Sequence, residues 1–182
     1  MQTEIVIAGF GGQGVLFTGQ LLSYAAMDCG KEVTWIPSYG PEMRGGTANC
    51  TVIISDEEIG SPQVRNPAAV IAMNLPSLDK YEALVKPGGV LIINASLVNR
   101  NAMRSDIKAV AIPASEIAEQ IGDRRLTNMV LLGGLLANLP VLSLENLQAA
   151  IRVHTPARHQ KLMPLNLLAL EQGATFLAQT AK

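Results

Sequence analysis

The pattern of apolar and polar positions predicts alternating strands and helices along the first two thirds of the chain. A short apolar run at residues 4–8 ends at glycines, which is typical of a buried strand followed by a turn. Over residues 15–29 the apolar positions recur at helical spacing, and Gly30 follows where a left-handed cap ends a helix. The pattern therefore predicts a strand, a glycine loop and a helix.

The next segment departs from a purely parallel arrangement. Strands are predicted at residues 32–37 and 48–55, and only the ten-residue loop 38–47 separates them. A parallel pair needs a connection of about a dozen residues or more. These two strands, if adjacent, are therefore expected to be antiparallel, which makes the sheet mixed.

The remaining pattern completes an α/β fold. It predicts strands at 68–73, 90–94 and 108–113, and helices at 77–85, 114–121, 126–138, 143–153 and after Pro156. The last third is predicted to be helical only, and its helices should cover the faces of the sheet. We expect one Rossmann-like, three-layer α/β/α domain over residues 1–182, with a mostly parallel, mixed sheet.

Charge and hydropathy exclude several classes of partner. Only 16% of the residues are charged, against roughly 25% in ordinary soluble domains, and the formal net charge is -1. This balance provides no basic surface for nucleic acid or an anionic membrane. The longest apolar stretch, residues 129–142, is too short to span a bilayer, and the first basic residue is Lys31, which argues against a signal peptide. A cytoplasmic protein is expected.

The two cysteines provide no metal site of their own. Cys29 and Cys50 lie 21 positions apart and form no CxxC pair. They fit reduced thiols, and two such residues alone cannot hold zinc or an iron–sulfur cluster. Any metal is therefore expected to come from a partner.

The glycine loop is the first candidate site. Residues 9–14 read GFGGQG and match G-x-G-x-x-G after a strand and before a helix, where backbone amides can hold an anion. Val15 and Leu16 replace the Lys and Ser/Thr of a Walker A loop, and no acidic residue ends the second strand to bind an NAD ribose. The alternative is that the glycines only allow the helix to pack closely on the strand.

A second glycine-rich loop leaves the same carboxyl edge of the predicted sheet, where ligands bind in open α/β folds. Residues 39–47 read YGPEMRGGT and present Glu42 and Arg44, which either contact a ligand or partner or are satisfied within the turn. A basic stretch near the C-terminus has the same ambiguity between phosphate or partner contact and a solvated helix start. Its members are Arg152, His154, Arg158, His159 and Lys161.

These loops carry a resemblance to a known family. GFGGQGV, SYGPEMRGGTANCTVIIS, NMVLLGGLLA and KLMPLNLLALEQGA together resemble the gamma subunit of 2-oxoacid:ferredoxin oxidoreductases over nearly the whole chain. The pairing of YGPEMRGG with GFGGQG is the most specific element.

The resemblance implies a subunit of an enzyme that oxidatively decarboxylates a 2-oxoacid to an acyl-CoA, with ferredoxin or flavodoxin as electron acceptor. It implies alpha and beta partner subunits, and in some complexes a ferredoxin-like delta subunit. Thiamine diphosphate, magnesium and the iron–sulfur clusters would lie in those partners, so this chain alone is expected to hold no cofactor and to be non-catalytic. The expected substrate is 2-oxoglutarate; pyruvate, branched-chain 2-oxoacids and indolepyruvate are the alternatives.

The resemblance also places this chain near the entrance for coenzyme A. Gly11, Gly12, Gln13, Gly14 and Arg44 are therefore the candidate binding residues. Two other classes of function remain open from the residues: an independent NAD(P)-dependent oxidoreductase, and a free-standing module that binds coenzyme A or a nucleotide.

Overall fold

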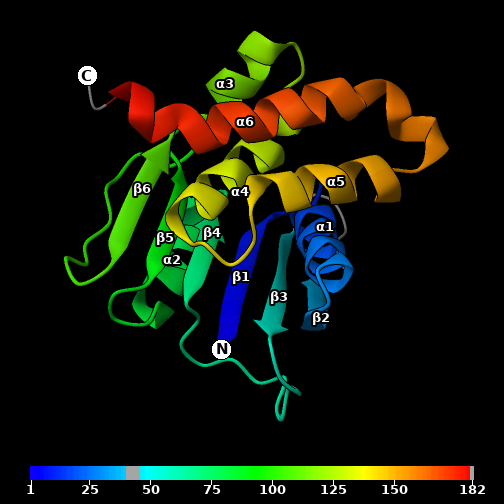
Figure 1. Cartoon of the computed structure of the whole chain (residues 1–182). Coiled ribbons are helices and arrows are strands. Elements are labelled where there is room, and N and C mark those ends of the chain that lie inside the picture. The colour runs from blue at the N-terminus through cyan, green and yellow to red at the C-terminus, as the bar shows by residue number, and fades with distance from the viewer. Residues whose placement is uncertain (40–45, 181–182) are drawn as a thin grey trace.

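The computed structural model describes residues 1–39 and 46–180, with backbone alone for Tyr39, Arg158, His159 and residues 177–180 (Figure 1). Its strands are β1 (Gln2–Phe10), β2 (Glu32–Tyr39), β3 (Thr47–Ser55), β4 (Ala69–Ala72), β5 (Val90–Asn94) and β6 (Lys108–Ile112). Its α-helices are α1 (Val15–Asp28), α2 (Leu75–Tyr81), α3 (Ala114–Ile121), α4 (Thr127–Asn138), α5 (Leu144–His154) and α6 (Met163–Thr180). Short 3₁₀ turns are η1 (Glu82–Leu84), η2 (Arg124–Leu126) and η3 (Ala157–Leu162).

The strands form one mixed sheet in the order β2-β3-β1-β4-β5-β6. Strand β3 is antiparallel to both β1 and β2, whereas β1, β4, β5 and β6 pair in parallel. This confirms the antiparallel pair expected from the short loop and the mostly parallel sheet. The register places Phe10 opposite Thr47 and Tyr39 opposite Ala48, so the carboxyl ends of β1 and β2 lie at one edge.

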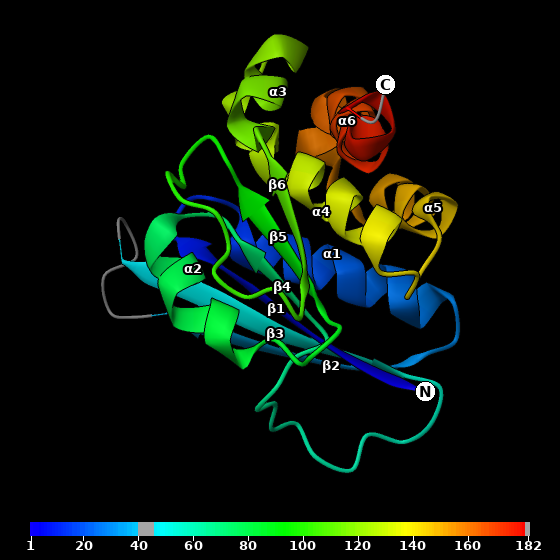
Figure 2. The same cartoon turned by 90° about the vertical axis from the view of Figure 1, so that its left-hand side faces the viewer.

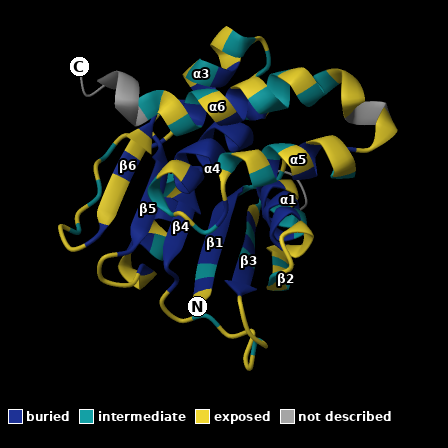
Figure 3. Ribbon diagram, viewed as in Figure 1, coloured by how far each residue is buried: buried dark blue, intermediate teal, exposed yellow. Residues whose placement is uncertain are grey.

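The two faces of the sheet are covered unequally. Helices α1, α3, α4, α5 and α6 lie on one face, and α2 with η1 lies on the other, as Figure 2 shows. The larger core joins the first face to these helices, whereas a smaller core surrounds Leu78, Val85 and Val98 on the second (Figure 3). The helices predicted for the last third thus cover one face only, and the second face takes its helix from the middle of the chain.

Helices α4 and α6 approach each other closely because glycines face backbone. A Cβ atom at Gly133 would lie 2.0 Å from the Leu170 carbonyl oxygen, and one at Gly173 would lie 1.8 Å from that of Val130. Helix α4 is buried along most of its length. None of the helices in the part of the chain that the structure describes combines the length and apolar character required to cross a bilayer.

Candidate functional site

The glycine loop joins the carboxyl end of β1 to the first turn of α1 in a conformation that favours glycine. Gly12 and Gly14 have φ values of 95° and 77°, in the left-handed region, and Gly14 is the N-cap of α1. The first turn of α1 contains no acidic residue, and no described side chain caps it. Its N–H groups therefore provide donors and positive potential for an anion.

A hollow of about 430 Å³ opens beside this turn, between the starts of α1 and β3. We call it the glycine-loop hollow. Its lining is mainly apolar and comprises Phe10, Gly11, Gly12, Gly14, Val15, Leu16, Phe17, Gly46, Thr47 and Ala48. Apolar walls beside N–H groups that no described side chain caps suit a ligand that carries both an anionic group and an apolar arm.

Buried polar residues of α1 and α4 form hydrogen bonds that hold the glycine loop in place. A Cβ atom at Gly14 would lie 2.5 Å from Asn128 Nδ2, so any larger residue here would displace the Asn128 amide of α4. The Asn128 amide donates to the hydroxyl of Thr18 at 3.2 Å, and that hydroxyl donates to the Gly14 carbonyl at 2.8 Å. At Gly14 the close neighbour is therefore α4 rather than the strand expected from the sequence, and this packing is compatible with anion binding at the same loop.

The side chain of Gln13 points away from the glycine-loop hollow and holds the loop in place. Its Oε1 accepts hydrogen bonds from the Phe10 N–H at 2.6 Å and from Asn74 Nδ2 at 3.1 Å. Asn74 in turn caps α2 by accepting from the Ser77 N–H at 2.9 Å. Gln13 therefore connects β1, the loop and the residue that follows β4.

A second, smaller hollow of about 230 Å³ lies on the Gln13 side of the loop. We call it the arginine hollow, and its lining comprises Gly12, Gln13, Met73, Leu97, Ser115, Arg124, Arg125 and Thr127. It lies between the carboxyl ends of β1 and β4, where the connections from neighbouring strands run in opposite directions, as at ligand sites of doubly wound folds.

The two arginines of this hollow are exposed and already paired. Arg124 lies 3.4 Å from Glu119, and Arg125 lies 2.6 Å from Asp123. Hydrogen bonding to Arg125 lowers the pKa of Asp123, which keeps that carboxylate charged. Sequence reasoning missed this hollow, although two adjacent arginines directly before a long apolar helix were a usable signal.

The described C-terminal end of the second glycine-rich loop, Gly46 and Thr47, lies beside the first loop. The Gly11 N–H donates to the Gly46 carbonyl at 2.9 Å, which joins the glycine loop to the start of β3. Gly11, Gly12 and Gly14 thus line one hollow. Glu42 and Arg44 lie outside the described residues.

The basic stretch near the C-terminus does not form one patch among the described side chains. Arg152 and Lys161 are exposed, whereas His154 turns inward against α1. His154 Nε2 lies 2.9 Å from Asp28 Oδ2, and its ring stacks on Tyr24 with centroids 4.5 Å apart. The sequence could not indicate this contact, because Asp28 lies 126 positions away.

The described cysteines occupy different environments. Cys29 is exposed, whereas Cys50 is fully buried beneath α1, and burial raises the pKa of its thiol to about 12. Its thiol donates to the Val15 carbonyl at 3.4 Å. Among the side chains that the structure describes, no three His, Cys, Asp or Glu residues gather as a metal site would require.

The structure is a Rossmann-like α/β domain with a glycine loop at the carboxyl end of β1. The family model described as pyruvate ferredoxin/flavodoxin oxidoreductase matches residues 4–176. The chain belongs to this family, as a gamma subunit of 2-oxoacid:ferredoxin oxidoreductase, which confirms the expected resemblance.

The curated relatives differ in length and in named substrate. Ketoisovalerate oxidoreductase subunit VorA of Methanothermobacter thermautotrophicus is 41% identical over 96% of this chain, which spans only 36% of that relative. The 2-oxoglutarate synthase subunit KorC of Methanocaldococcus jannaschii is 36% identical, over 95% of this chain and 92% of the relative.

Solved structures share the fold. The keto/oxoacid ferredoxin oxidoreductase gamma subunit of Geobacter sulfurreducens superposes with a TM-score of 0.83 at 31% identity, covering 97% of this chain and 99% of that one. The 2-oxoglutarate:ferredoxin oxidoreductase of Magnetococcus marinus, solved with 2-oxoglutarate, coenzyme A and succinyl-CoA, has a TM-score of 0.86 at 24% identity. The match covers 98% of this chain and 31% of that one. Because the identity is only 24%, this second likeness shows the fold alone.

Proposed function

We propose that this gamma subunit binds coenzyme A at the glycine-loop hollow, for a complex that oxidatively decarboxylates a 2-oxoacid to an acyl-CoA. The main supporting observation is the first turn of α1, which has no acidic residue and no described side-chain cap, beside an apolar hollow. Diphosphate oxygens suit the N–H groups, and the pantetheine arm suits the apolar wall. Coenzyme A in the Magnetococcus enzyme is consistent with this assignment.

The proposal assigns the redox chemistry to partner chains. Alpha and beta subunits, with a ferredoxin-like delta subunit where one exists, would hold thiamine diphosphate, magnesium and the iron–sulfur clusters. Electrons would pass from them to ferredoxin or flavodoxin. The contribution of this chain is then to bind and orient the thiol acceptor, and Gly11, Gly12 and Gly14 shape the place where its anionic part lies.

Within this family we propose 2-oxoglutarate as the substrate. The supporting observation is that a 2-oxoglutarate synthase subunit matches this chain over 92% of its own length. Ketoisovalerate is the second candidate, because the ketoisovalerate subunit has the higher identity, 41%.

Purification of the complex through a tag on this chain, followed by a substrate panel, decides between these substrates. We expect CoA-dependent reduction of ferredoxin or a viologen dye with 2-oxoglutarate, at a kcat/KM at least about tenfold above that with 2-ketoisovalerate. Such a ratio corresponds to roughly 1.4 kcal/mol of transition-state discrimination. The reverse preference would assign the complex to branched-chain 2-oxoacids.

A charge placed in the glycine loop tests binding of coenzyme A. Gly12 is exposed, lines the hollow and has no atom within 4 Å of an added Cβ, so Gly12→Asp and Gly12→Asn have room and share the same backbone strain. They differ in one negative charge close to the expected diphosphate. We expect Gly12→Asp to raise the KM for coenzyme A about tenfold above that of Gly12→Asn, and to do so less at high salt.

The matched pair separates charge from shape. Equal KM values for coenzyme A in Gly12→Asp and Gly12→Asn would remove the glycine loop from the anion site. Decarboxylation of the 2-oxoacid in the absence of coenzyme A provides the internal reference, because the proposal places that half-reaction in the partner subunits.

A further inference from the structure

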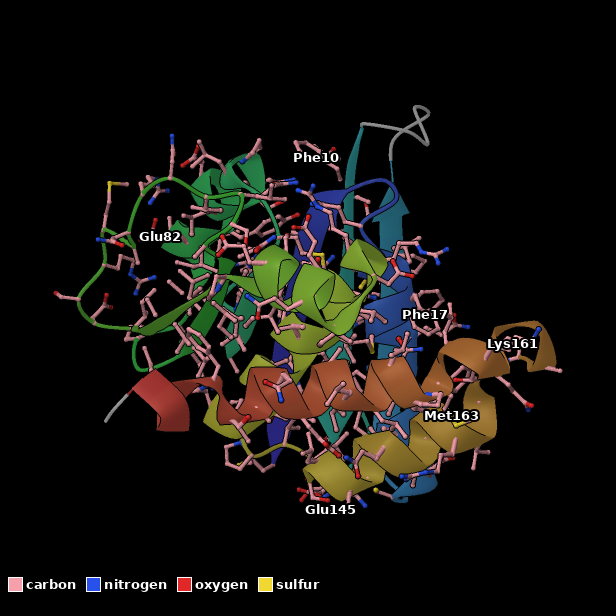
Figure 4. The ribbon with its side chains drawn as sticks, turned by 90° about the horizontal axis from the view of Figure 1, so that it is seen from above. Phe10, Phe17, Glu82, Glu145, Lys161 and Met163 are labelled. Carbon is pink, nitrogen blue, oxygen red and sulfur yellow. The ribbon has the colours of Figure 1, made fainter. Side chains whose placement is uncertain are left out.

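Another hollow, of about 290 Å³, lies farther along α1 and has a different lining. We call it the aromatic slot and define it by Phe17, Gln20, Tyr24, His154 and Thr155. Phe17 lines both this slot and the glycine-loop hollow, so the two adjoin along the helix. In Figure 4, Phe17 lies on α1 between Phe10, at the glycine-loop end, and Lys161 of η3.

The walls of the slot are two aromatic groups on one side of α1. Phe17 and Tyr24 are seven residues apart, which is two helical turns and about 10.5 Å along the axis. Gln20 lies between them on the same side and donates to the Tyr24 hydroxyl at 3.0 Å. Phe17 remains 42% exposed although it is a large apolar side chain. Phe17 and Tyr24 both line this hollow of about 290 Å³, so a flat ring bound in it would lie against their side chains.

The side of the slot that Tyr24 and His154 form is held in position by contacts within the protein. The ring of His154 stacks on Tyr24 at 4.5 Å with an interplanar angle of 17°, and its Nε2 lies 2.9 Å from Asp28. Thr155 directly follows His154 in the chain; it is buried and also lines the slot. A stacked aromatic wall with nearby amide and hydroxyl groups is the chemistry that proteins use to bind a nucleobase.

The distance between slot and loop fits a nucleotide. Gln20 lies six residues after Gly14, which is about 9 Å along the axis of α1. This is comparable to the separation between the diphosphate and the base in an extended nucleotide. The slot therefore lies where a base would reach if its diphosphate were bound at the first turn of α1.

We propose that the aromatic slot binds the adenine ring of coenzyme A, between Phe17 and Tyr24. This rests on the proposed binding of coenzyme A at the glycine loop and adds the direction of the ligand. The adenine end points toward α5, the diphosphate lies at the first turn of α1, and the pantetheine arm crosses the apolar wall toward Phe10 and Thr47. The thiol therefore leaves this subunit where β1 ends at Phe10 and β3 begins at Thr47.

The test compares ligands with and without the adenine nucleotide in the assembled complex. Tyr24→Leu removes the ring from the slot and retains a shorter apolar side chain. We expect it to raise the KM for coenzyme A about tenfold, the effect of losing one base–aromatic stack. The KM for 4′-phosphopantetheine, which lacks the adenosine, should stay within twofold. Inhibition by adenosine 3′,5′-bisphosphate, competitive with coenzyme A, should weaken by the same factor as coenzyme A.

Met27→Ala is the matched control, because Met27 is 57% exposed one turn farther along α1 and does not line the slot. Thermal unfolding of both variants shows whether α1 keeps its packing. Equal weakening of coenzyme A and 4′-phosphopantetheine in Tyr24→Leu would overturn the slot as an adenine site. An unchanged KM for coenzyme A in Tyr24→Leu would also overturn it. If Arg125→Gln raises the KM for coenzyme A while Tyr24→Leu does not, the base binds in the arginine hollow.

The Gly12 and Tyr24 variants separate binding at the glycine loop from binding in the aromatic slot. If Gly12→Asp weakens coenzyme A relative to Gly12→Asn but Tyr24→Leu does not, the glycine-loop site stands and the slot is overturned. If neither variant changes the KM for coenzyme A, both proposals are overturned.

Discussion

Replacing Gly173 by alanine is expected to lower the free energy of unfolding by about 3 kcal/mol, at the upper end of the usual overpacking range. The added Cβ would lie 1.8 Å from the Val130 carbonyl oxygen and 2.7 Å from its carbon, so α4 and α6 must move apart. Backbone atoms cannot yield as the end of a flexible side chain does. For a chain of this length the melting temperature should fall by roughly 6–12 °C.

Gly60→Ala is the matched control for this substitution. Nothing lies within 4 Å of a Cβ at Gly60, so we expect a change within about 0.5 kcal/mol. Gly133→Ala should behave like Gly173→Ala, because its Cβ would lie 2.0 Å from the Leu170 carbonyl oxygen. A melting temperature of Gly173→Ala within 1 °C of wild type would show that the helices are not in close contact.

Removal of the charge of Glu82 is expected to produce the second largest loss of stability. The Glu82 side chain is only 5% exposed, and it accepts hydrogen bonds from Arg100 at 2.9 Å and from the backbone N–H groups of Met103 and Arg104. It thereby fastens the segment between β5 and β6 to η1. Glu82→Gln should lower the free energy of unfolding by about 2–3 kcal/mol, because Arg100 loses its buried charged partner and the hydrogen bonds to the carboxylate are weakened.

The pH dependence of this effect has a defined sign. Burial raises the pKa of Glu82, but the hydrogen bonds from Arg100 and from the two backbone N–H groups outweigh it and lower the pKa below the ordinary 4.5. A lowered pKa in the folded state gives stability that is fully present above the unfolded pKa and is lost as the pH falls through the folded value. The stability difference between wild type and Glu82→Gln should be constant above about pH 5.5 and shrink below pH 4.5.

Asp79→Asn provides the control for Glu82, because Asp79 contacts the same Arg100 at 2.6 Å but is 57% exposed. An exposed ion pair contributes less than about 1 kcal/mol. Chemical unfolding of the three proteins from pH 3.5 to 8 measures both effects. Equal losses in Glu82→Gln and Asp79→Asn would mean that the burial of Glu82 adds nothing.

Local patterns were sufficient for most elements of the fold. The strand–glycine–helix start was predicted because an apolar run, glycines and helical spacing each depend on neighbouring residues. The antiparallel pair of β2 and β3 followed from the length of one loop, and Gly30 has the expected left-handed φ of 73°. The unequal cover of the sheet could not be predicted, because the choice of face depends on which helices share a core.

The candidate site was only partly accessible to such reasoning. The anion-accepting turn at residues 9–14 was visible as a motif, because glycine spacing directly reflects the backbone conformation. The role of Gln13 was not visible, since its partner Asn74 follows a different strand and meets it only in the folded sheet. The same holds for Arg124 and Arg125, which reach the Gln13 side of the loop through the packing of α4.

The amino-acid sequence alone determined the class of fold, the glycine loop and the family to which the chain belongs, because these depend on local spacing and on motifs. Tertiary structure decided which residues face each hollow. The stack of Tyr24 on His154 joins positions 130 residues apart, and only the packing of α5 on α1 brings them together. The direction proposed for coenzyme A depends on that contact, because a binding groove is a property of packed surfaces rather than of any one segment.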